Sequence, residues 1–470
     1  MNDEAVWAEE EFGEADLGDV RRTVRLVQLA TMLGAQPSAS LPAAAPDWAD
    51  LKAAYRFFDN DYVPAEAVLG SHVEATTRRL QTAPMVLAVQ DTTYLDWTDH
   101  AATEGLGPLA APTHQGLLAH TTLALTPERV PLGLLQQQTW ARDEEVGQQK
   151  DHHRRAITEK ESEKWLASLA AVIDVQKQCP QTHFVSVGDR EADIYDLFVA
   201  ERPSHVDLLV RAAQNRSTDH PERYLWPTLA AAPLAVTATI RVGARAGQPG
   251  RTALLEVRWR QVRLRRPARR KVKDGPPTFT VWAVWANETT PPPGVSPVEW
   301  MLLTTVPVHT TADALERLEW YTARWGIEVW HKVLKSGCRI ESRQLATADR
   351  LKRCLALYSV IAWRILYATM LARALPDAPC SVLLDEAEWQ ALYCRIHRVT
   401  TPPAQPPPLA TAVRWIAQLG GYLNRKGDGP PGVTVLWKGF QHLVEITAMY
   451  QIMRPQLPVT GQVIQNTRSG

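Results

Sequence analysis

The 470-residue sequence predicts an α/β protein in which a mixed sheet is flanked by helical N-terminal and C-terminal regions. Short apolar runs typical of buried strands recur between residues 85 and 211 and return near residue 300. Apolar residues at helical spacing dominate residues 21–58 and the chain after Asp349. A chain of this length is too long for one simple core, so two or three domains are expected.

The N-terminal region is expected to contain two helices. Arg21–Leu33 has apolar residues at helical spacing, and Asp19 stands in front of it as an N-cap. After a Pro/Ala-rich stretch, Trp48–Phe58 forms the second helical segment. Together they predict a small helical domain over residues 1–83.

The next region is expected to hold most of the sheet, within a domain covering residues 84–376. Met85–Gln90 reads as a buried strand that ends at Asp91. The further elements expected are two strands of an antiparallel meander at Leu117–Leu125 and Val130–Gln138, a helix at Glu159–Gln176, a strand at Phe184–Val187, a helix from about Glu191 and a strand at Val206–Arg211.

Residues 215–298 change character. They combine β-branched residues, Gly, Pro and many Arg, with alternation in Val236–Val242 and Thr278–Trp285, which predicts a β-rich insertion. A strand at Trp300–Val306 follows, then a helix over Thr311–Lys335 that Gly337 stops. The chain after Asp349 is helical apart from a linker at Pro402–Pro408, and residues 377–470 are expected to form a C-terminal domain.

Composition narrows the class of protein. Hydrophobic residues make up 45% and charged residues 22% of the chain, as in globular proteins. There is no run of about eighteen apolar residues, so no membrane span is expected, and the acidic N-terminus does not read as a secretory signal. The five cysteines form no CxxC pair, which favours reduced thiols in a cytoplasmic setting and disfavours a zinc site.

Charge is unevenly distributed although the formal net charge is zero and the pI is about 7.2. Residues 1–20 contain acids and no Lys or Arg, whereas residues 241–273 hold about a dozen basic residues against the single Glu256. A neutral total alone argues weakly against nucleic-acid binding, but this layout argues for it.

The most informative segment is Leu318–Lys335, which predicts one helix. Five polar side chains fall within about 80° of one another around its axis. They are Tyr321, Arg324, Glu328, Lys332 and Lys335. In such a stripe a carboxylate can hold a divalent metal ion, while the neighbouring cations can hold phosphates.

Two further carboxylates can join Glu328. Asp91 and Asp189 each follow a short apolar strand, and strand ends of a mixed α/β sheet are a usual place for ligands. Three converging carboxylates would suit two Mg²⁺ or Mn²⁺ ions, which prefer oxygen ligands. Two such ions can activate a water or a 3′-hydroxyl and stabilise the leaving oxygen in phosphoryl transfer.

These motifs resemble those of the bacterial cut-and-paste DDE transposases of the Tn-five type, in the IS-four insertion-sequence group. The shared signature is Tyr, two residues, Arg, three residues, Glu, six residues and Lys, which stands here as Tyr321, Arg324, Glu328 and Lys335. Flanking matches are Asp91-Thr92-Thr93, Asp189-Arg190-Glu191-Ala192-Asp193, Trp300-Met-Leu-Leu-Thr304 and Leu17-Gly18-Asp19 before Arg21-Arg22.

The resemblance implies an RNase H-like catalytic core in which Asp91, Asp189 and Glu328 form the catalytic, metal-binding triad with two Mg²⁺ ions, for which Mn²⁺ can substitute. It implies excision through a hairpin at each transposon end, followed by joining of the 3′-hydroxyls to target DNA. The DNA contacts that it implies are phosphate contacts from Tyr321, Arg324 and Lys335, stacking of Trp300 near a flipped-out base, and an end-binding arm of Arg21, Arg22 and Arg25.

Arg190, which lies in a matching motif, and Lys332, on the same stripe, are also expected to contact DNA, although Lys332 could instead only neutralise Glu328. The resemblance further implies dimerisation through the C-terminal helices, with each subunit of the homodimer cleaving in trans. The expected location is the bacterial cytoplasm, with nucleoid association during action and no membrane partner.

Several alternatives stay open on the residues alone. Asp91 and Asp189 could be turn residues, Glu328 could pair with Lys332 on a solvent-facing helix, and Trp300 could be plain core. Asp96 and Asp193 are read as surface or capping acids, and His152 and His153 are given no role. The basic block Arg258–Lys273 could be a solvated face or a DNA-backbone contact.

Two alternative functions also remain. One is a DNA-binding regulator that has kept the fold without catalysis. The other is a two-carboxylate hydrolase such as a glycosidase, which does not explain the cations beside Glu328.

Overall fold

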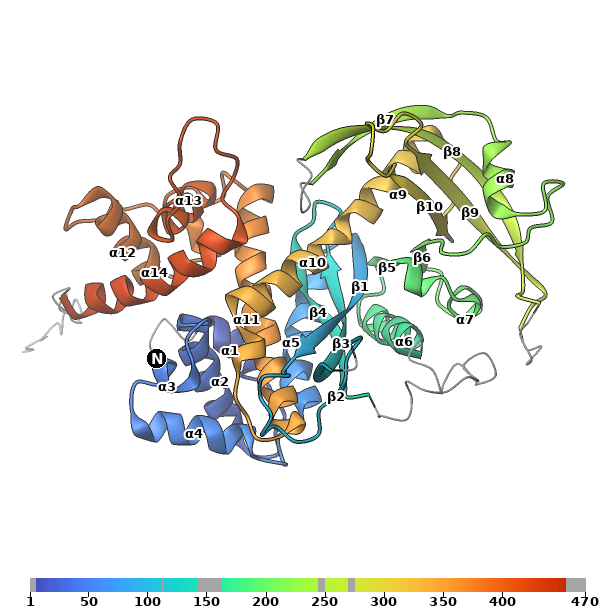
Figure 1. Cartoon of the computed structure of the whole chain (residues 1–470). Coiled ribbons are helices and arrows are strands. Elements are labelled where there is room, and N and C mark those ends of the chain that lie inside the picture. The colour runs from blue at the N-terminus through green and yellow to red at the C-terminus, as the bar shows by residue number, and fades with distance from the viewer. Residues whose placement is uncertain (1–5, 112, 143–162, 244–249, 269–274, 454–470) are drawn as a thin grey trace, which may run out of the picture. The chain divides into compact units, whose positions relative to one another are not determined.

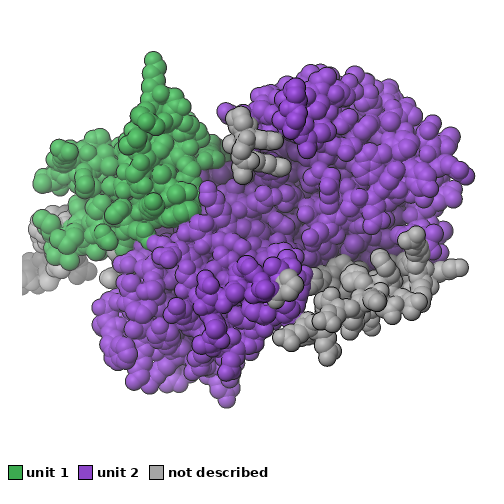
Figure 2. Space-filling model, in the orientation of Figure 1, with its two compact units in different colours: residues 1–4, 371–470 green, residues 5–370 purple. Residues whose placement is uncertain are grey.

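The computed structural model describes residues 6–111, 113–142, 163–243, 250–268 and 275–453. The chain separates into two compact units, one of residues 5–370 and one of residues 1–4 with 371–470 (Figure 2). The expected C-terminal domain began at residue 377. Each unit is described by itself below.

The larger unit begins with five helices. Their bounds are α1 (Val6–Phe12), α2 (Val20–Ala35), α3 (Leu41–Ala44), α4 (Trp48–Phe58) and α5 (Ala65–Leu80). Asp19 caps α2 as expected, because its carboxylate accepts a hydrogen bond of 2.9 Å from the backbone N–H of Arg21. Helix α4 begins and ends at the residues that the sequence predicted, Trp48 and Phe58. Helix α5 was not expected.

The sheet has ten strands and contains both parallel and antiparallel pairs (Figure 1). The strands are β1 (Met85–Asp96), β2 (Gly107–Pro108), β3 (Gln115–Leu125), β4 (Pro131–Trp140), β5 (His183–Gly188), β6 (Val206–Arg211), β7 (Val236–Val242), β8 (Arg251–Arg265), β9 (Thr278–Asn287) and β10 (Glu299–Thr304). Strand β3 is antiparallel to β1 and β4, while β5 is parallel to both β1 and β6. An α/β protein with a mixed sheet is therefore confirmed.

The β-rich insertion is part of this sheet. Strand β10 pairs antiparallel with β6 on one side and with β9 on the other, and β8 and β7 continue the order outward. Figure 1 shows β7, β8 and β9 grouped with β10. The expected alternating segment Val236–Val242 is β7, and the short helix α8 (Leu225–Ala230) precedes it. The insertion therefore extends the sheet on which the earlier strands lie.

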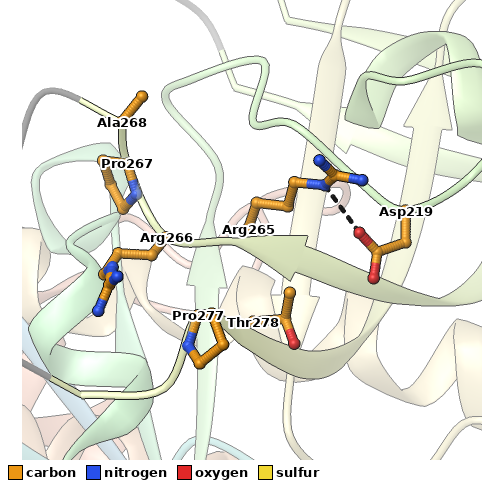
Figure 3. A pocket seen from close by; sticks show the side chains of 7 residues that line it. All are labelled: Asp219, Arg265, Arg266, Pro267, Ala268, Pro277 and Thr278. Atoms are coloured by element: carbon orange, nitrogen blue, oxygen red, sulfur yellow. Dashed lines mark hydrogen bonds and ion pairs between the residues drawn. The ribbon is translucent and has the colours of Figure 1, made fainter. Parts of the chain in front are cut away.

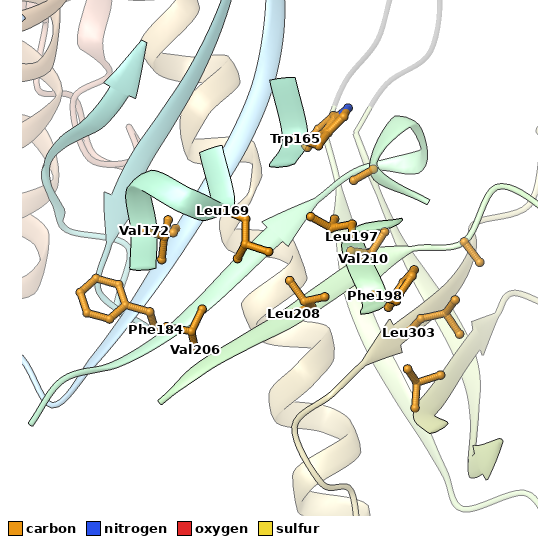
Figure 4. Packing of buried hydrophobic residues seen from close by; sticks show 14 of the residues in the cluster. Trp165, Leu169, Val172, Phe184, Leu197, Phe198, Val206, Leu208, Val210 and Leu303 are labelled. Carbon is orange, nitrogen blue, oxygen red and sulfur yellow. The ribbon is translucent and has the colours of Figure 1, made fainter. Parts of the chain in front are cut away.

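One hydrophobic cluster joins α6 (Glu163–Gln178) and α7 (Tyr195–Val199) to the sheet. Figure 4 shows side chains of α6 beside those of β5 and β6, and those of α7 near Leu303 of β10. The labelled members are Trp165, Leu169, Val172, Phe184, Leu197, Phe198, Val206, Leu208, Val210 and Leu303. Complete burial of an aliphatic or Phe side chain of this kind contributes about 1.5–3 kcal/mol, so this cluster fixes β5 and β6 side by side.

Strand β1 is longer than the sequence indicated. It was expected to end at Gln90, but its antiparallel pairing with β3 continues through Asp91↔Thr121 to Asp96↔Gly116. Its parallel pairing with β5, in contrast, ends at Val89↔Val187. The expectation that Asp91 follows the end of β1 is therefore wrong. Asp91 lies within β1, two residues beyond the last pair between β1 and β5. The polar Asp-Thr-Thr run stays extended because β3 still pairs with it.

The expected single helix Leu318–Lys335 is three consecutive pieces. They are α9 (Thr311–Ala323), α10 (Trp325–Lys332) and a π-helical turn, Val333–Gly337. Thr310 and Asp313 form a capping box that starts α9. Trp320 and Trp330 of this segment are buried, whereas Trp325 is 38% exposed.

Helix α11 (Ala348–Ala374) and two arginines join the N-terminal helices to the rest of the larger unit. Arg353 donates to the carbonyl oxygens of Val63 (2.8 Å) and Phe58 (3.0 Å). Arg343, just after the 3₁₀ turn Ile340–Ser342, donates to the carbonyl oxygens of Ala39, Pro37 and Cys338. Both guanidinium groups lie on buried residues, so these contacts are shielded from water.

Helix α11 is the one described helix that is long and apolar enough to cross a membrane by length and composition. However, 83% of its most apolar window is buried within the fold, which is the situation of a core helix.

The smaller unit is helical. It contains the 3₁₀ turn Cys380–Val382, α12 (Glu386–His397), α13 (Leu409–Leu419) and α14 (Val433–Met453), with the expected linker before α13. Helices α13 and α14 approach closely at Gly439. A Cβ at this position would lie only 1.9 Å from the Ile416 carbonyl oxygen, so the close approach requires glycine. None of the five cysteines, which all lie within the described residues, takes part in a disulfide bond.

Candidate active site

Asp91 and Asp189 lie side by side because their strands are parallel neighbours. The last paired residues of β1 and β5 are Val89 and Val187, and each aspartate stands two residues beyond. Asp189 accepts a hydrogen bond of 2.8 Å from the backbone N–H of Glu191 and so starts the 3₁₀ turn Arg190–Ala192. The sheet register therefore brings the two expected carboxylates together at the carboxyl end of the paired part of β1 and β5.

Arg324 links Glu328 to Asp91. It sits where α9 passes into α10, and its Nη2 lies 2.6 Å from Oε1 of Glu328 while its Nη1 lies 3.7 Å from Oδ2 of Asp91. The Arg324 side chain is only 10% exposed, whereas that of Glu328 is 52% exposed. The pair expected as an alternative, Glu328 with Lys332, does not form. Lys332 is exposed and has no ion pair among the described residues.

Asp91 lies within electrostatic reach of both Asp189 and Glu328. Burial is the largest cause and raises the pKa of Asp91 to about 6; Arg324 opposes this effect, and the negative charges of Asp189 and Glu328 add to it. Burial also raises the pKa of Asp189, against the hydrogen bond from the Glu191 N–H. Closely placed acids with raised pKa values in a partly buried site are a frequent mark of function.

The donor chemistry of these acids fits a hard divalent cation. Carboxylate oxygens are the ligands that Mg²⁺ and Mn²⁺ prefer, and burial together with the two neighbouring acids raises the pKa of Asp91 despite the nearby Arg324. Among the described residues, however, no three His, Cys, Asp or Glu side chains lie close enough together to hold a metal ion in this arrangement. In this arrangement the guanidinium of Arg324 provides the positive charge beside Asp91 and Glu328.

Tyr321 and Trp300 pack against each other beside the acids. Tyr321 is 2% exposed and Trp300 7% exposed, and their rings meet edge to face with centroids 5.5 Å apart. Burial raises the pKa of Tyr321, whose hydroxyl group also hydrogen-bonds to Arg211. In this state Trp300 is thus core-like, and its expected stacking on a base stays a prediction.

Arg211 is a site residue that sequence reasoning missed. It ends β6, one residue beyond the pair Gly188↔Val210, so it lies next to Asp189 in the parallel register. It also donates to the Glu299 carbonyl oxygen at 2.8 Å. The available signal was its place at the end of an apolar strand, the same signal that singled out Asp189.

Lys335 is turned toward β1. It lies in the π-helical turn, donates to the Tyr94 carbonyl oxygen and forms an ion pair of 3.1 Å with Glu341. Such turns often occur at functional sites. Arg190 is exposed in the turn after Asp189.

The three arginines expected to bind the element's end lie on α2. Arg21 is the most accessible of the three, since its side chain is 87% exposed, and it forms an ion pair with Asp19. Arg22 donates to the Leu17 carbonyl oxygen at 2.7 Å and lies over the Tyr62 ring, and Arg25 is 3.3 Å from Asp50.

The basic block is partly neutralised by its surroundings. Arg258 pairs with Glu256, and Arg265 pairs with Asp219 at 2.7 Å. Figure 3 shows the latter pair at a pocket of about 360 Å³ that also has Arg266 on its wall. Residues 269–273 of the block lie outside the described residues. DNA contact by this block stays a prediction.

Replacing Asp91 by Asn should stabilise the protein at neutral pH. A folded-state pKa of about 6, above the ordinary 3.8, means that the folded state loses stability relative to the unfolded state as pH rises from about 4 to 6. The full loss is about 3 kcal/mol. Denaturant unfolding at pH 4 and pH 7 should show the advantage of Asp91→Asn growing with pH.

Asp96, at the end of the same strand, is the matched control. Burial works against its charged form, but hydrogen bonds from Thr98 and the neighbouring His114 outweigh burial and lower the pKa of Asp96. Asp96→Asn should therefore lose stability at pH 7 relative to pH 3. An Asp91→Asn variant that is less stable than wild type at pH 7 would contradict this account.

Comparison with known proteins matches both ends of the chain to named domains. Residues 4–63, which include the three arginines of α2, match a family model described as transposase DNA-binding. Residues 360–454, which include α12, α13 and α14, match a model described as the Tn5 (Tn-five) transposase dimerisation domain.

Among solved structures, the chain is similar to the piggyBac transposase synaptic complex with hairpin DNA, at 8% sequence identity and a TM-score of 0.41, with 97% of this chain and 83% of that chain covered. A TM-score of this size does not establish a shared fold. The chain thus carries regions that match the DNA-binding and the dimerisation domains of Tn5-type transposases at its two ends.

Proposed function

We propose that this protein is a cut-and-paste DNA transposase of the DDE type. It binds the inverted ends of its element, cleaves them through a hairpin intermediate and joins the 3′-hydroxyl ends to target DNA. The observation that carries the proposal is the juxtaposition of Asp91 and Asp189, each two residues beyond the last pair between β1 and β5, with Glu328 linked to Asp91 through Arg324. The domain matches at the two ends of the chain support the same conclusion.

The proposed core is RNase H-like. Apart from the two-residue β2, the first strands of the sheet follow the order β4-β3-β1-β5-β6. Strand β3 lies between β1 and β4 and is antiparallel to both. A fold of this kind places acids at the ends of its central strands, where β1 and β5 carry Asp91 and Asp189.

Asp91, Asp189 and Glu328 would hold two Mg²⁺ ions, or Mn²⁺ in their place. Bound there, such ions supply activation of the attacking water or 3′-hydroxyl and stabilisation of the leaving oxygen. The protein's own cations have the separate task of holding DNA phosphates. Arg324 already lies beside Asp91 and Glu328, and a phosphate would offer its guanidinium a bidentate partner.

The remaining cations extend the phosphate-binding surface. These are Lys335 in the π-helical turn, exposed Lys332 at the end of α10 and exposed Arg190 after Asp189, and the Tyr321 hydroxyl would add a neutral donor. Arg211 joins this group through its hydrogen bond to Tyr321. Neutralising several phosphates in this way gives affinity that falls steeply with salt.

The proposed assembly is a homodimer on double-stranded DNA, joined through the C-terminal helices and cleaving in trans. The proposed setting is the bacterial cytoplasm, with nucleoid association while the enzyme acts. The match of residues 360–454 to a transposase dimerisation domain supports the assembly.

A second candidate is a DNA-binding regulator without catalysis. The observation that favours it is the ion pair of Arg324 with Glu328, in a chain whose described residues form no ready ion-holding group. A regulator would bind the element's ends and leave them intact.

Cleavage of cognate ends separates these candidates. Linear DNA with the inverted ends that flank the gene, incubated with the protein and Mg²⁺, should yield a hairpin on the released transposon end. Asp91→Ala, Asp189→Ala and Glu328→Ala should each abolish cleavage while end binding persists, and Asp96→Asn should cleave normally. Equal absence of cleavage by wild type and Glu328→Ala would establish the regulator, and cleavage that resists a chelator would exclude the two-metal mechanism.

Trp300 should matter most for the hairpin step. Trp300→Ala should slow hairpin formation more than first-strand nicking, because stacking of one base is worth about 1–3 kcal/mol. Single-turnover rates of the two steps measure this difference. Since Trp300 packs on Tyr321, Trp300→Phe is the control that retains an aromatic face. Equal slowing of both steps by Trp300→Ala would reject the stacking role.

Arg21→Ala and Arg25→Ala should weaken binding of the element's end without affecting metal dependence. Each should lower the slope of log affinity against log salt by about one, as expected for one lost phosphate contact. Titrations at several salt concentrations provide the measurement. Arg425, whose side chain is 71% exposed in the smaller unit, is the matched control, and Arg425→Ala should leave the slope unchanged. Unchanged slopes for both α2 variants would remove them from the interface.

A further inference from the structure

Asp193 is buried, although the sequence indicated a surface or capping acid. Its side chain is 0% exposed and that of its partner Arg216 is 5% exposed. It ends the 3₁₀ turn that Asp189 begins, and its backbone N–H bonds to the Arg190 carbonyl oxygen. A buried ion pair four residues from a proposed catalytic acid calls for a physical role.

Every acceptor position of the Asp193 carboxylate is used. Oδ1 accepts from Nε and Nη2 of Arg216 at 2.8 and 2.6 Å. Oδ2 accepts from the backbone N–H groups of Ala213 and Gln214 at 2.8 and 3.1 Å. Nη2 of Arg216 also donates to the Asp193 carbonyl oxygen at 2.6 Å. Because two N–H groups of Arg216 converge on one oxygen and two backbone N–H groups on the other, the pair is fully satisfied and fixed in both orientation and distance.

The pair occupies the place where sheet pairing stops. Parallel pairing of β5 with β6 ends at Gly188↔Val210, so Asp189 and Arg211 lie just beyond the last ladder contact. The segment after Arg211 is the one that Asp193 binds, through Ala213, Gln214 and Arg216. Asp193 thus connects the segments that follow β5 and β6, beyond the point where these two strands are paired.

The turn between Asp189 and Asp193 can pass on this constraint because it is tight. A Cβ on Gly188 would lie 2.4 Å from Cβ of Ala192, so the turn folds back directly on the end of β5. Asp189 itself is held in the turn by the N–H of Glu191. Fixing Asp193 therefore leaves Asp189 little freedom.

We propose that Asp193 and Arg216 are positioning residues that hold Asp189 and Arg211 at a fixed separation. This proposal rests on the proposed function, in which Asp189 is a metal ligand and Arg211 belongs to the phosphate-binding group. Groups behind metal ligands typically contribute 10–100-fold to metal affinity or activity.

The test compares variants of this pair in the full-length protein on cognate DNA ends. Asp193→Asn and Arg216→Gln should each slow cleavage about 10–100-fold and raise the Mg²⁺ concentration for half-maximal rate. End-binding affinity should stay within about twofold of wild type, because the N-terminal helices are untouched. Arg216→Lys, which keeps the charge but loses the bidentate fork, should fall between wild type and Arg216→Gln. The double variant Asp193→Asn/Arg216→Gln should be no slower than the worse single variant.

Asp207 provides the matched control. Its carboxylate pairs with His183 at 2.8 Å and so also joins β5 to β6, but near the opposite ends of these strands. Asp207→Asn should lower the melting temperature without changing the Mg²⁺ requirement. If the Asp193 variants fail to fold, Arg216→Lys carries the test alone.

The outcomes separate the two proposals. Cleavage by wild type with an unchanged Mg²⁺ requirement in all variants of the pair would overturn the positioning role alone. The same shift in the Asp207→Asn variant would mean a general loss of stability and would also overturn it. Absence of cleavage by wild type would overturn the proposed function, and the positioning role with it.

Discussion

Parallel pairing of β1 with β5 is the constraint on which the site depends. It sets Asp91 and Asp189 at the same level of the sheet, where two carboxylates repel each other and lose water. Arg324 approaches from the helical side and favours the charged forms of both acids, as do hydrogen bonds from the backbone N–H groups of Thr92 and Glu191. These contacts offset part of the cost of keeping the two acids together.

Elements with strong local boundaries could be predicted from the sequence. Helix α4, strand β6 and strand β7 have the expected limits: Asp47 caps α4, Pro203 lies three residues before β6, and Gly243 follows β7. Strands β7 and β9 of the insertion were also foreseen, but β8 and the place of these strands in the sheet were not. Membership in the sheet depends on the pairing of β10 with β6 and β9, which no local pattern records.

The site was predictable where chemistry is local and unpredictable where it is not. Apolar runs and helical spacing singled out Asp91, Asp189 and Glu328, and in the structure Asp189 and Glu328 lie within electrostatic reach of Asp91, while their catalytic role stays a prediction. The burial of Asp193 depends on Arg216, which lies beyond the whole of β6, so it looked like one more polar turn residue. At the π-helical turn that begins at Val333, Lys335 contacts the Tyr94 carbonyl oxygen of β1, a contact between distant segments that no local pattern records.

The arginines that join α11 and its preceding loop to the N-terminal helices have one more consequence. Arg353 and Arg343 bind main-chain carbonyl oxygens, which every amino acid possesses. Apart from the contact of Arg353 with the Asp61 carboxylate at 2.8 Å, these bonds do not depend on the side chains of the N-terminal helices, so those side chains can change as long as the backbone keeps its path. The outward-facing residues of the region that matches a transposase DNA-binding family can in this way vary while its attachment to the rest of the larger unit stays the same.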